Sequence, residues 1–169
     1  VILITVKGLY SLQPNQAAVL SLFGKYVGTV KENGLRWNNP FFSQEKISLR
    51  VRNFESSKLK VNEREGSPIE IAAVIVWDVV DASEAVYNVD NFEDFVHIQS
   101  EAALRAMASS YPYDQHEEGQ IALRSHPQEI SQHLQEQIAE RLEGFIGTYD
   151  ALGRFGGDEF VVVLGQQPN

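Results

Sequence analysis

The sequence contains no cysteine among its 169 residues. This absence excludes a disulfide framework, a thiolate zinc site and a cysteine nucleophile, and it is typical of a reducing compartment. No apolar stretch approaches the roughly 18–20 residues that a helix needs to cross a bilayer. The hydrophobic fraction of 43% and the charged fraction of 22% are ordinary for a globular domain. The length fits one domain with a small appendage.

Basic residues are scarce, with 14 Lys and Arg against 23 Asp and Glu and a net charge of −9. Broad nucleic-acid binding is therefore not expected. The scarcity is confined to one part of the chain, because residues 1–61 carry a charge of +6 and residues 62–169 carry −15. Either the two halves are solvated differently, or the basic half faces an anionic partner. That partner would be lipid headgroups or the acidic half of a neighbouring copy.

The histidines and serines show none of the spacings known from metal sites or hydrolases. The histidines His126 and His133 lie seven positions apart, which is too far for the usual metal pair on one helix. His116 lies in a polar loop beside Glu117 and Glu118, where a solvated role is expected, and no serine has the glycine context of a hydrolase nucleophile. We therefore predict neither a metal site nor a hydrolase triad.

The first eighty residues predict β-strands. β-Branched and aromatic residues are frequent there, and Gly24-Lys25 is a plausible tight turn between two strands. The segment 33–40 is rich in turn-forming residues and is expected to end this pair. The opening "VILITV" is either a first strand or the end of a membrane segment. The predicted strands are residues 16–24, 26–32, 46–54, 58–62 and 68–81.

The predicted strand 46–54 alternates between apolar and polar residues. Ile47, Leu49 and Val51 would face the core, while Arg50 and Arg52 would give the strand a basic outer face. A solvated face is the ordinary explanation for this pattern, and contact with an anionic group is the functional one.

Helices are predicted in the second half of the chain, over residues 81–89, 91–110 and 126–144. Asp81 and Asn91 have the side chains that cap helix N-termini, and a proline stands near the start of the third helix. The apolar stripe expected for the second helix is Phe92, Phe95, Val96, Ala103, Ala106 and Met107. The stripe expected for the third helix is Ile130, Leu134, Ile138 and Leu142. A hairpin turning at Gly156-Gly157 is expected to follow.

Four short segments occur in an order that resembles one known family. They are "QPNQAAV" from residue 13, "GLRWNNPF" from residue 34, "RVRNFES" from residue 50 and "SEAALR" from residue 100. Together they resemble the SPFH domain, also called band 7 or the prohibitin-homology domain, and most of all its bacterial stomatin-like branch. The resemblance covers roughly residues 5–143.

This resemblance implies an α+β fold. It would contain a curved antiparallel β-sheet of about five to seven strands packed against three or four helices, with the predicted C-terminal β-hairpin added. It implies a non-catalytic scaffold that assembles into homo-oligomers and organises membrane proteins, proteases or lipids. The expected partners are other copies, a membrane surface and a client membrane protein or protease. No cofactor and no catalytic residue are implied.

The same resemblance implies a location at the bacterial inner membrane, through an N-terminal segment that precedes this chain. The membrane-proximal residues would be Val1, Ile2, Leu3 and Ile4. The candidate oligomer or lipid contacts are Lys46, Arg50, Arg52, Lys58 and Lys60.

A second resemblance covers only residues 148–165, "TYDALGRFGGDEFVVVLG". This stretch is similar to the signature hairpin of the diguanylate cyclases, which make cyclic di-GMP from GTP. Under this alternative Gly156 and Gly157 let the backbone approach a nucleotide, and Asp158 and Glu159 help to hold Mg²⁺. The signature motif of this hairpin is Gly156-Gly157-Asp158-Glu159-Phe160. The alternative function is therefore that of a cyclic di-GMP-related nucleotide-binding protein or a diguanylate cyclase remnant. A cyclase also needs upstream metal-binding carboxylates, which are not found in the sequence, and this weighs against cyclase activity.

The predicted organisation is therefore one SPFH-like domain over residues 1–143 and a tail over 144–169. The tail is too short to fold as an independent domain. Its origin is a gene fusion, an engineered join or chance. We hypothesise that its strand "EFVVVLG" replaces the last strand of the family and pairs at the edge of the sheet.

Overall fold

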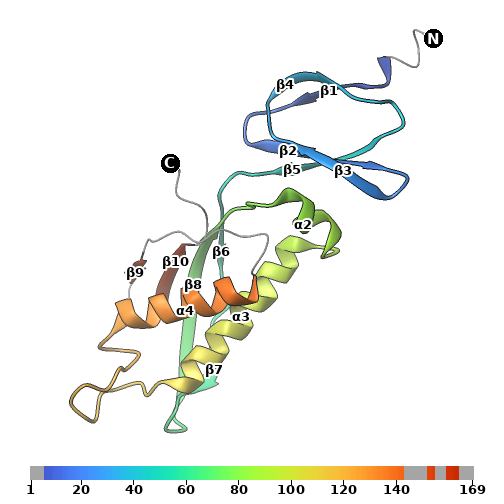
Figure 1. Ribbon diagram of the computed structural model, residues 1–169. Helices are drawn as coiled ribbons and strands as arrows, with labels where there is room; N and C mark the ends of the chain where they lie inside the picture. The colour runs from blue at the N-terminus through green and yellow to red at the C-terminus, as the bar shows by residue number, and fades with distance from the viewer. Residues whose placement is uncertain (1–5, 143–151, 155–158, 164–169) are drawn as a thin grey trace.

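The computed structural model describes residues 6–142, 152–154 and 159–163 (Figure 1). In these residues it contains ten strands and three helices, so the α+β class is confirmed. The strands are β1 (Leu9–Leu12), β2 (Gln16–Leu22), β3 (Lys25–Val30), β4 (Gly34–Trp37), β5 (Ser43–Ser48), β6 (Arg52–Glu55), β7 (Leu59–Asn62), β8 (Pro68–Trp77), β9 (Leu152–Arg154) and β10 (Glu159–Val163). The helices are α2 (Ala82–Tyr87), α3 (Phe92–Ser110) and α4 (Pro127–Arg141).

The strands form three small sheets rather than the single curved sheet that we expected. One sheet pairs β1 with β4, a second has the order β3-β2-β5, and the third joins β6, β7, β8, β10 and β9. The first two sheets make up a region that we call the β-lobe, which Figure 1 shows at one end of an elongated molecule. The other end holds the third sheet with α3 and α4.

The predicted strand 46–54 is broken, which is one reason for the separate sheets. β5 ends at Ser48, β6 begins at Arg52, and the intervening Val51 is exposed. The last hydrogen bond between this strand and the β2 side runs from the backbone N–H of Leu49 to the carbonyl of Asn15 at 2.8 Å, next to the Gln16–Ser48 pair. The alternation between Ile47 and Val51 therefore does not continue, and the expected uniform basic outer face does not form.

The turn predicted over residues 33–40 contains a strand. Gly34 adopts a φ of +105°, and the next three residues extend to pair with β1. The turn-forming residues of this segment flank the strand, because Asn38, Asn39 and Pro40 follow Trp37 directly. Because these flanking residues dominate the composition of residues 33–40, the segment was predicted as a turn and β4 was not predicted.

The hairpin between β2 and β3 turns one residue earlier than predicted. Phe23 and Gly24 both adopt positive φ angles, of +50° and +83°, and Leu22 pairs with Lys25. Two consecutive residues with positive φ are the requirement of a type I′ turn. A bulky aromatic rarely adopts this conformation, so Phe23 is an unusual residue at this position.

β2 lies between two hydrophobic cores. Ala17 and Val19 belong to the large core with the helices, whereas Ala18 and Leu20 belong to a small core with β1. Alternate residues of a strand point to opposite faces, so a strand covered on both faces is apolar throughout. This explains the uninterrupted "AAVL" of the sequence.

The helix predictions are largely confirmed. The side chain of Asp81 accepts hydrogen bonds from the first turn of α2, and that of Asn91 does the same for α3. The four residues expected on the apolar stripe of α4 are all buried. One residue of the α3 stripe is wrong, because Ala106 is exposed and Leu104 is buried in its place.

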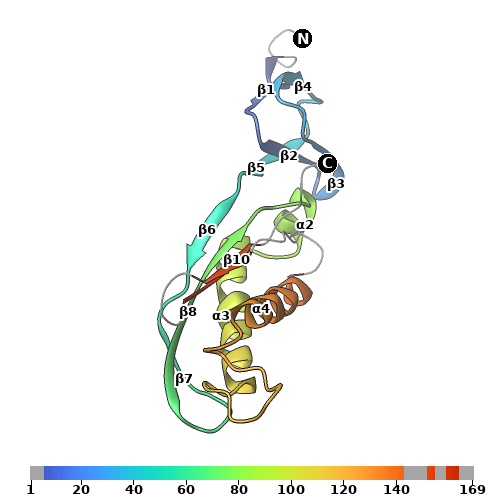
Figure 2. The same ribbon diagram turned by 90° about the vertical axis from the view of Figure 1, so that its left-hand side faces the viewer.

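The third sheet is built around β8. β6 and β7 pair with β8 in the antiparallel direction, and β10 pairs with it in the parallel direction, with Val161 opposite Val74. β9 pairs antiparallel with β10, so the C-terminal hairpin is confirmed, although its turn lies outside the described residues. Figure 2 shows α3 and α4 together on one face of this sheet. The pairing of β10 with β8 agrees with the hypothesis for "EFVVVLG", and β9 then lies at the outer edge.

Candidate functional site

Three exposed apolar side chains lie on the outer face of the β1–β4 ribbon, together with Ser11, which is opposite Leu35. In the register of this pair, Leu9 lies opposite Trp37, and Leu35 lies two residues before Trp37 on the same face. These three side chains are between 47% and 74% exposed, while Tyr10 and Leu12 point the other way into the small core. We call Leu9, Leu35 and Trp37 the ribbon face.

The indole of Trp37 lies close to the backbone at Gly8. Asn38 donates its backbone N–H to the carbonyl of Gly8 at 2.9 Å. A Cβ atom at Gly8 would lie 2.2 Å from the carbonyl oxygen of Asn38 and 2.8 Å from Nε1 of Trp37. Only glycine permits this close approach of the Asn38 carbonyl and the Trp37 indole to the backbone at position 8. Contiguous exposed apolar residues are typical of interaction surfaces.

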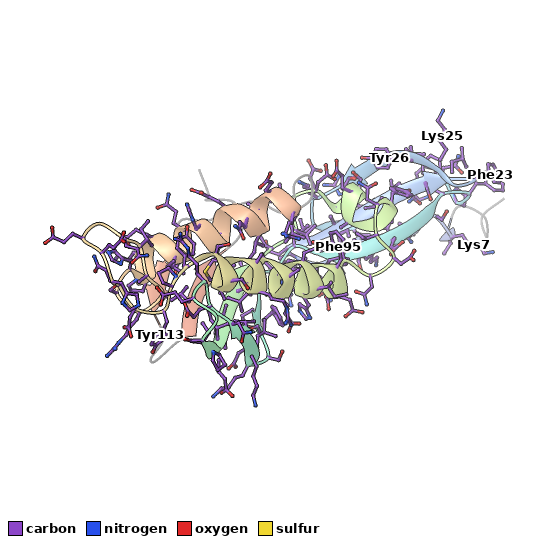
Figure 3. All side chains as sticks on the ribbon, turned by 90° about the horizontal axis from the view of Figure 1, so that it is seen from below. Lys7, Phe23, Lys25, Tyr26, Phe95 and Tyr113 are labelled. Atoms are coloured by element: carbon purple, nitrogen blue, oxygen red, sulfur yellow. The ribbon has the colours of Figure 1, made fainter. Side chains whose placement is uncertain are left out.

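A second exposed feature is the tip of the β2–β3 hairpin. The side chain of Phe23 is 88% exposed, and Lys25 follows it after one glycine. Figure 3 shows Phe23 and Lys25 at the extreme end of the hairpin, pointing away from the rest of the protein. We call Phe23, Gly24 and Lys25 the hairpin tip.

Among the five predicted basic contacts, Arg52 has an internal role. Its Nε lies 3.2 Å from Oε1 of Glu93, and another guanidinium N–H donates to the carbonyl of Ser48 at 3.2 Å. The guanidinium also lies 5.2 Å from the ring centre of Trp77 and 5.3 Å from that of Phe92. These contacts tie β6 to β8 and to the start of α3.

The other four basic residues do not form one patch. Lys46 donates to a backbone carbonyl of β1 at 2.9 Å, and Lys60 lies 3.7 Å from a carboxylate oxygen of Glu70. Arg50 and Lys58 are exposed, and neither forms an ion pair with any residue in the described part of the chain. The structure thus separates the five residues that the sequence grouped.

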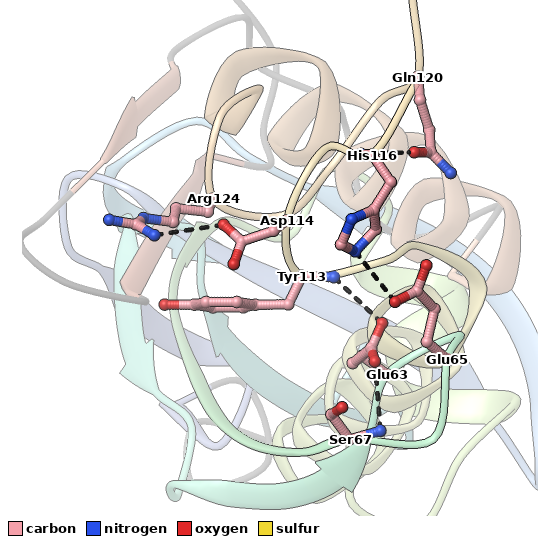
Figure 4. Close-up of polar contacts among 8 residues, drawn as sticks. All are labelled: Glu63, Glu65, Ser67, Tyr113, Asp114, His116, Gln120 and Arg124. Carbon is pink, nitrogen blue, oxygen red and sulfur yellow. Dashed lines mark hydrogen bonds and ion pairs between the residues drawn. The ribbon is translucent and has the colours of Figure 1, made fainter. Parts of the chain in front are cut away.

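A pocket of about 530 Å³ lies at the opposite end of the molecule, between the β7–β8 turn and the loop after α3 (Figure 4). Four of its nine lining residues are acidic, namely Glu63, Glu65, Glu70 and Asp114. His116 Nε2 lies 3.0 Å from Glu65 Oε2, and Asp114 pairs with Arg124 at 3.2 Å. The charge asymmetry of the sequence is therefore also a separation in space, with this acidic pocket far from the β-lobe.

Glu63 fixes the geometry of this pocket. Its buried carboxylate accepts the backbone N–H of Ser67 at 3.2 Å and that of Tyr113 at 3.1 Å, which joins the two loops. Burial raises the pKa of Glu63, but hydrogen bonds from the backbone at Glu65, Ser67 and Tyr113 and from the Ser67 side chain outweigh it. The net pKa of Glu63 lies below its ordinary value.

We expect a Glu63→Gln variant to be less stable than the wild type at pH 7, and this difference to shrink in acid. Because the pKa of Glu63 is lowered on folding, its charged form stabilises the protein above the ordinary value of 4.5. This stabilisation is lost as the pH falls through the lower pKa of the folded state. Urea unfolding midpoints of both proteins between pH 7 and pH 3 measure the effect. A difference that stays constant over this range would contradict the role of the carboxylate.

Several sequence-predicted sites lie outside the described residues. For Glu159 only the backbone, at the start of β10, is described. The remaining such residues are Val1, Ile2, Leu3, Ile4, Gly156, Gly157 and Asp158. Within the described residues no group of three potential metal ligands comes together. None of the helices found there has the length and apolarity to cross a bilayer.

Sequence reasoning missed both the ribbon face and the hairpin tip. The alternation in "LYSL" and in "GLRW" is a signal for two half-buried strands, but their pairing across more than twenty residues is not visible in the sequence. Phe23 was assigned to a strand because phenylalanine favours strands, and its place in the turn was not predicted.

A protein family and one curated protein each match more than half of this chain. The pattern of the SPFH domain / Band 7 family matches residues 10–151. An uncharacterized protein of the archaeon Methanothermobacter thermautotrophicus is 29% identical over 115 residues, which is 68% of this chain and 36% of that protein. The chain thus spans about a third of the length of this curated relative.

Proposed function

Because this chain belongs to the SPFH domain / Band 7 family, we propose that it is a scaffold domain that self-assembles at a membrane surface. Members of the family are generally non-catalytic scaffolds associated with membranes. In this role the domain organises client membrane proteins, a protease or lipids, and it performs no chemistry of its own. The scaffold role of any longer protein that contains this domain is likewise proposed.

The ribbon face is the observation that supports self-assembly. Leu9, Leu35 and Trp37 lie on one face of a two-stranded ribbon, and each is between 47% and 74% exposed. Exposing such residues together costs solubility unless a partner covers them. A second copy is the partner that the family predicts.

The exposed basic residues support a role beside an anionic partner. Arg50 and Lys58 lie outside the internal ion pairs, and they remain candidates for contact with lipid or with a neighbouring copy. Such contacts at a solvent-exposed rim affect orientation and association rate more than affinity. The membrane-proximal role of residues 1–4 remains part of the same proposal.

A charge in the ribbon face tests the assembly. We expect Leu35→Lys to weaken self-association at least tenfold, because the change places an unpaired charge in an apolar interface. Leu35 is 74% exposed, so the monomer itself should fold normally. Sedimentation velocity over a concentration series gives the association constant of the wild type and the variant.

The matched control is Ile98→Lys, which adds the same charge at an exposed isoleucine on α3. This control should associate as the wild type does. Equal association constants for all three proteins would show that the ribbon face is not the interface, and a wild type that stays monomeric at every concentration would refute self-assembly by this chain.

A further inference from the structure

We propose that the hairpin tip is an interfacial membrane anchor, which places Phe23 among the headgroups of an anionic bilayer and Lys25 against their phosphates. This inference rests on the membrane association in the proposed function and adds a defined point of contact. It differs from anchoring by an upstream hydrophobic segment, because the residues concerned belong to a folded loop of the β-lobe.

The first argument is the conformation of Phe23. Its φ of +50° lies in the left-handed region, which a bulky residue adopts only at a cost. Asparagine or glycine would occupy this turn position more easily. Strained residues of this kind are found where function requires them. The turn gains nothing from the aromatic ring, so the ring has a role outside the fold.

The second argument is the shape and exposure of the tip. Phe23 is the most exposed large apolar residue of the described chain, at 88%, and it projects from a tight turn at the end of a hairpin. A protein partner would need a complementary pocket to bury a single projecting ring. A single convex aromatic residue enters the soft interface of a bilayer without a complementary pocket.

The third argument is charge. Residues 6–48 contain five basic residues and two acidic ones, while residues 62–169 carry −15. Lys25 lies beside the ring at the tip itself. An anionic surface attracts the β-lobe and repels the opposite end with its acidic pocket, so the molecule approaches the membrane tip first.

Co-flotation with vesicles tests the anchor. The probes are phosphatidylcholine vesicles with and without phosphatidylglycerol. The protein tested is the 169-residue chain. We expect the wild type to float with the anionic vesicles, and Phe23→Asn and Lys25→Glu each to weaken partitioning about tenfold. Phe23→Asn creates an Asn-Gly pair, which is the favoured sequence for this turn, so a folding defect does not explain its loss of binding.

The matched control removes an exposed apolar side chain from α3, outside the β-lobe. Ile98 on α3 is exposed, and Ile98→Gln should partition as the wild type does. A Phe23→Trp variant in a Trp37→Phe background reports depth. The remaining Trp77 is buried, so brominated lipids should quench only the indole at the tip.

The outcomes separate the anchor from the proposed function. Flotation that Phe23→Asn leaves unchanged, or an indole that brominated lipids do not quench, would overturn the anchor and leave membrane association standing. Absence of flotation with anionic vesicles would overturn the anchor and the membrane part of the proposed function, whereas self-association is measured independently. Loss of self-association in Phe23→Asn without a change in flotation would assign the tip to a second copy and also overturn the anchor.

Discussion

Replacing Trp77 with alanine is expected to lower the free energy of unfolding by about 3–5 kcal/mol, the usual cost of emptying a large buried site. Trp77 is 1% exposed at the end of β8, where its ring meets the edge of Phe92. Arg52 lies over the same ring, so the change removes packing and a cation–π contact together. This cost is a large fraction of the 5–15 kcal/mol that stabilises a typical domain.

Urea unfolding followed by circular dichroism measures this loss, with Trp77→Phe as the control. Phenylalanine keeps an aromatic ring for Arg52 and Phe92 and leaves a smaller cavity, so it should cost clearly less than alanine. A loss below about 1 kcal/mol for alanine would contradict the central place that the structure gives to this residue.

Replacing Val161 with proline is expected to leave the protein mostly unfolded or insoluble. β10 lies between β8 and β9, so each of its inner backbone N–H groups belongs to a ladder on one side or the other. Proline has no N–H and is not tolerated in an inner strand. The change also separates β8 from its parallel partner and exposes an apolar strand edge, which promotes aggregation.

Asp158→Ala is the control for this prediction, because it alters the cyclase-like motif at the residue before β10 begins. We expect this variant to express and unfold as the wild type does. Soluble fraction after expression and thermal unfolding distinguish the two variants. If Val161→Pro behaved as the wild type and Asp158→Ala did not, the segment would serve its motif rather than the sheet.

The sequence predicted the helices well and the sheets poorly, for a physical reason. A helix is specified by residues a few positions apart, so the cap at Asn91 and the stripe from Ile130 to Leu142 were visible directly. A sheet depends on partners far apart in the chain. The pairing of β1 with β4 and the break after Ser48 follow from tertiary contacts that composition does not reveal.

The candidate sites show the same limit. The sequence grouped five basic residues of two predicted strands as candidate contacts. In the structure Arg52 instead lies over Trp77 and pairs with Glu93, while Lys46 and Lys60 have local partners of their own. The ribbon face required the register of two strands, and the hairpin tip required a turn that starts one residue earlier than expected. The resemblance to the SPFH family, carried by four short segments, was confirmed over residues 10–151.

The parallel pairing of β10 with β8 has a consequence for synthesis on the ribosome. Val74 and Val161 are opposite each other and 87 positions apart, so translation makes β8 long before its partner exists. Synthesis at about 5–20 residues per second leaves this edge of β8 uncovered for several seconds. A nascent chain with an open apolar strand is a typical substrate for chaperones. Completion of the sheet therefore has to wait until β10 has emerged.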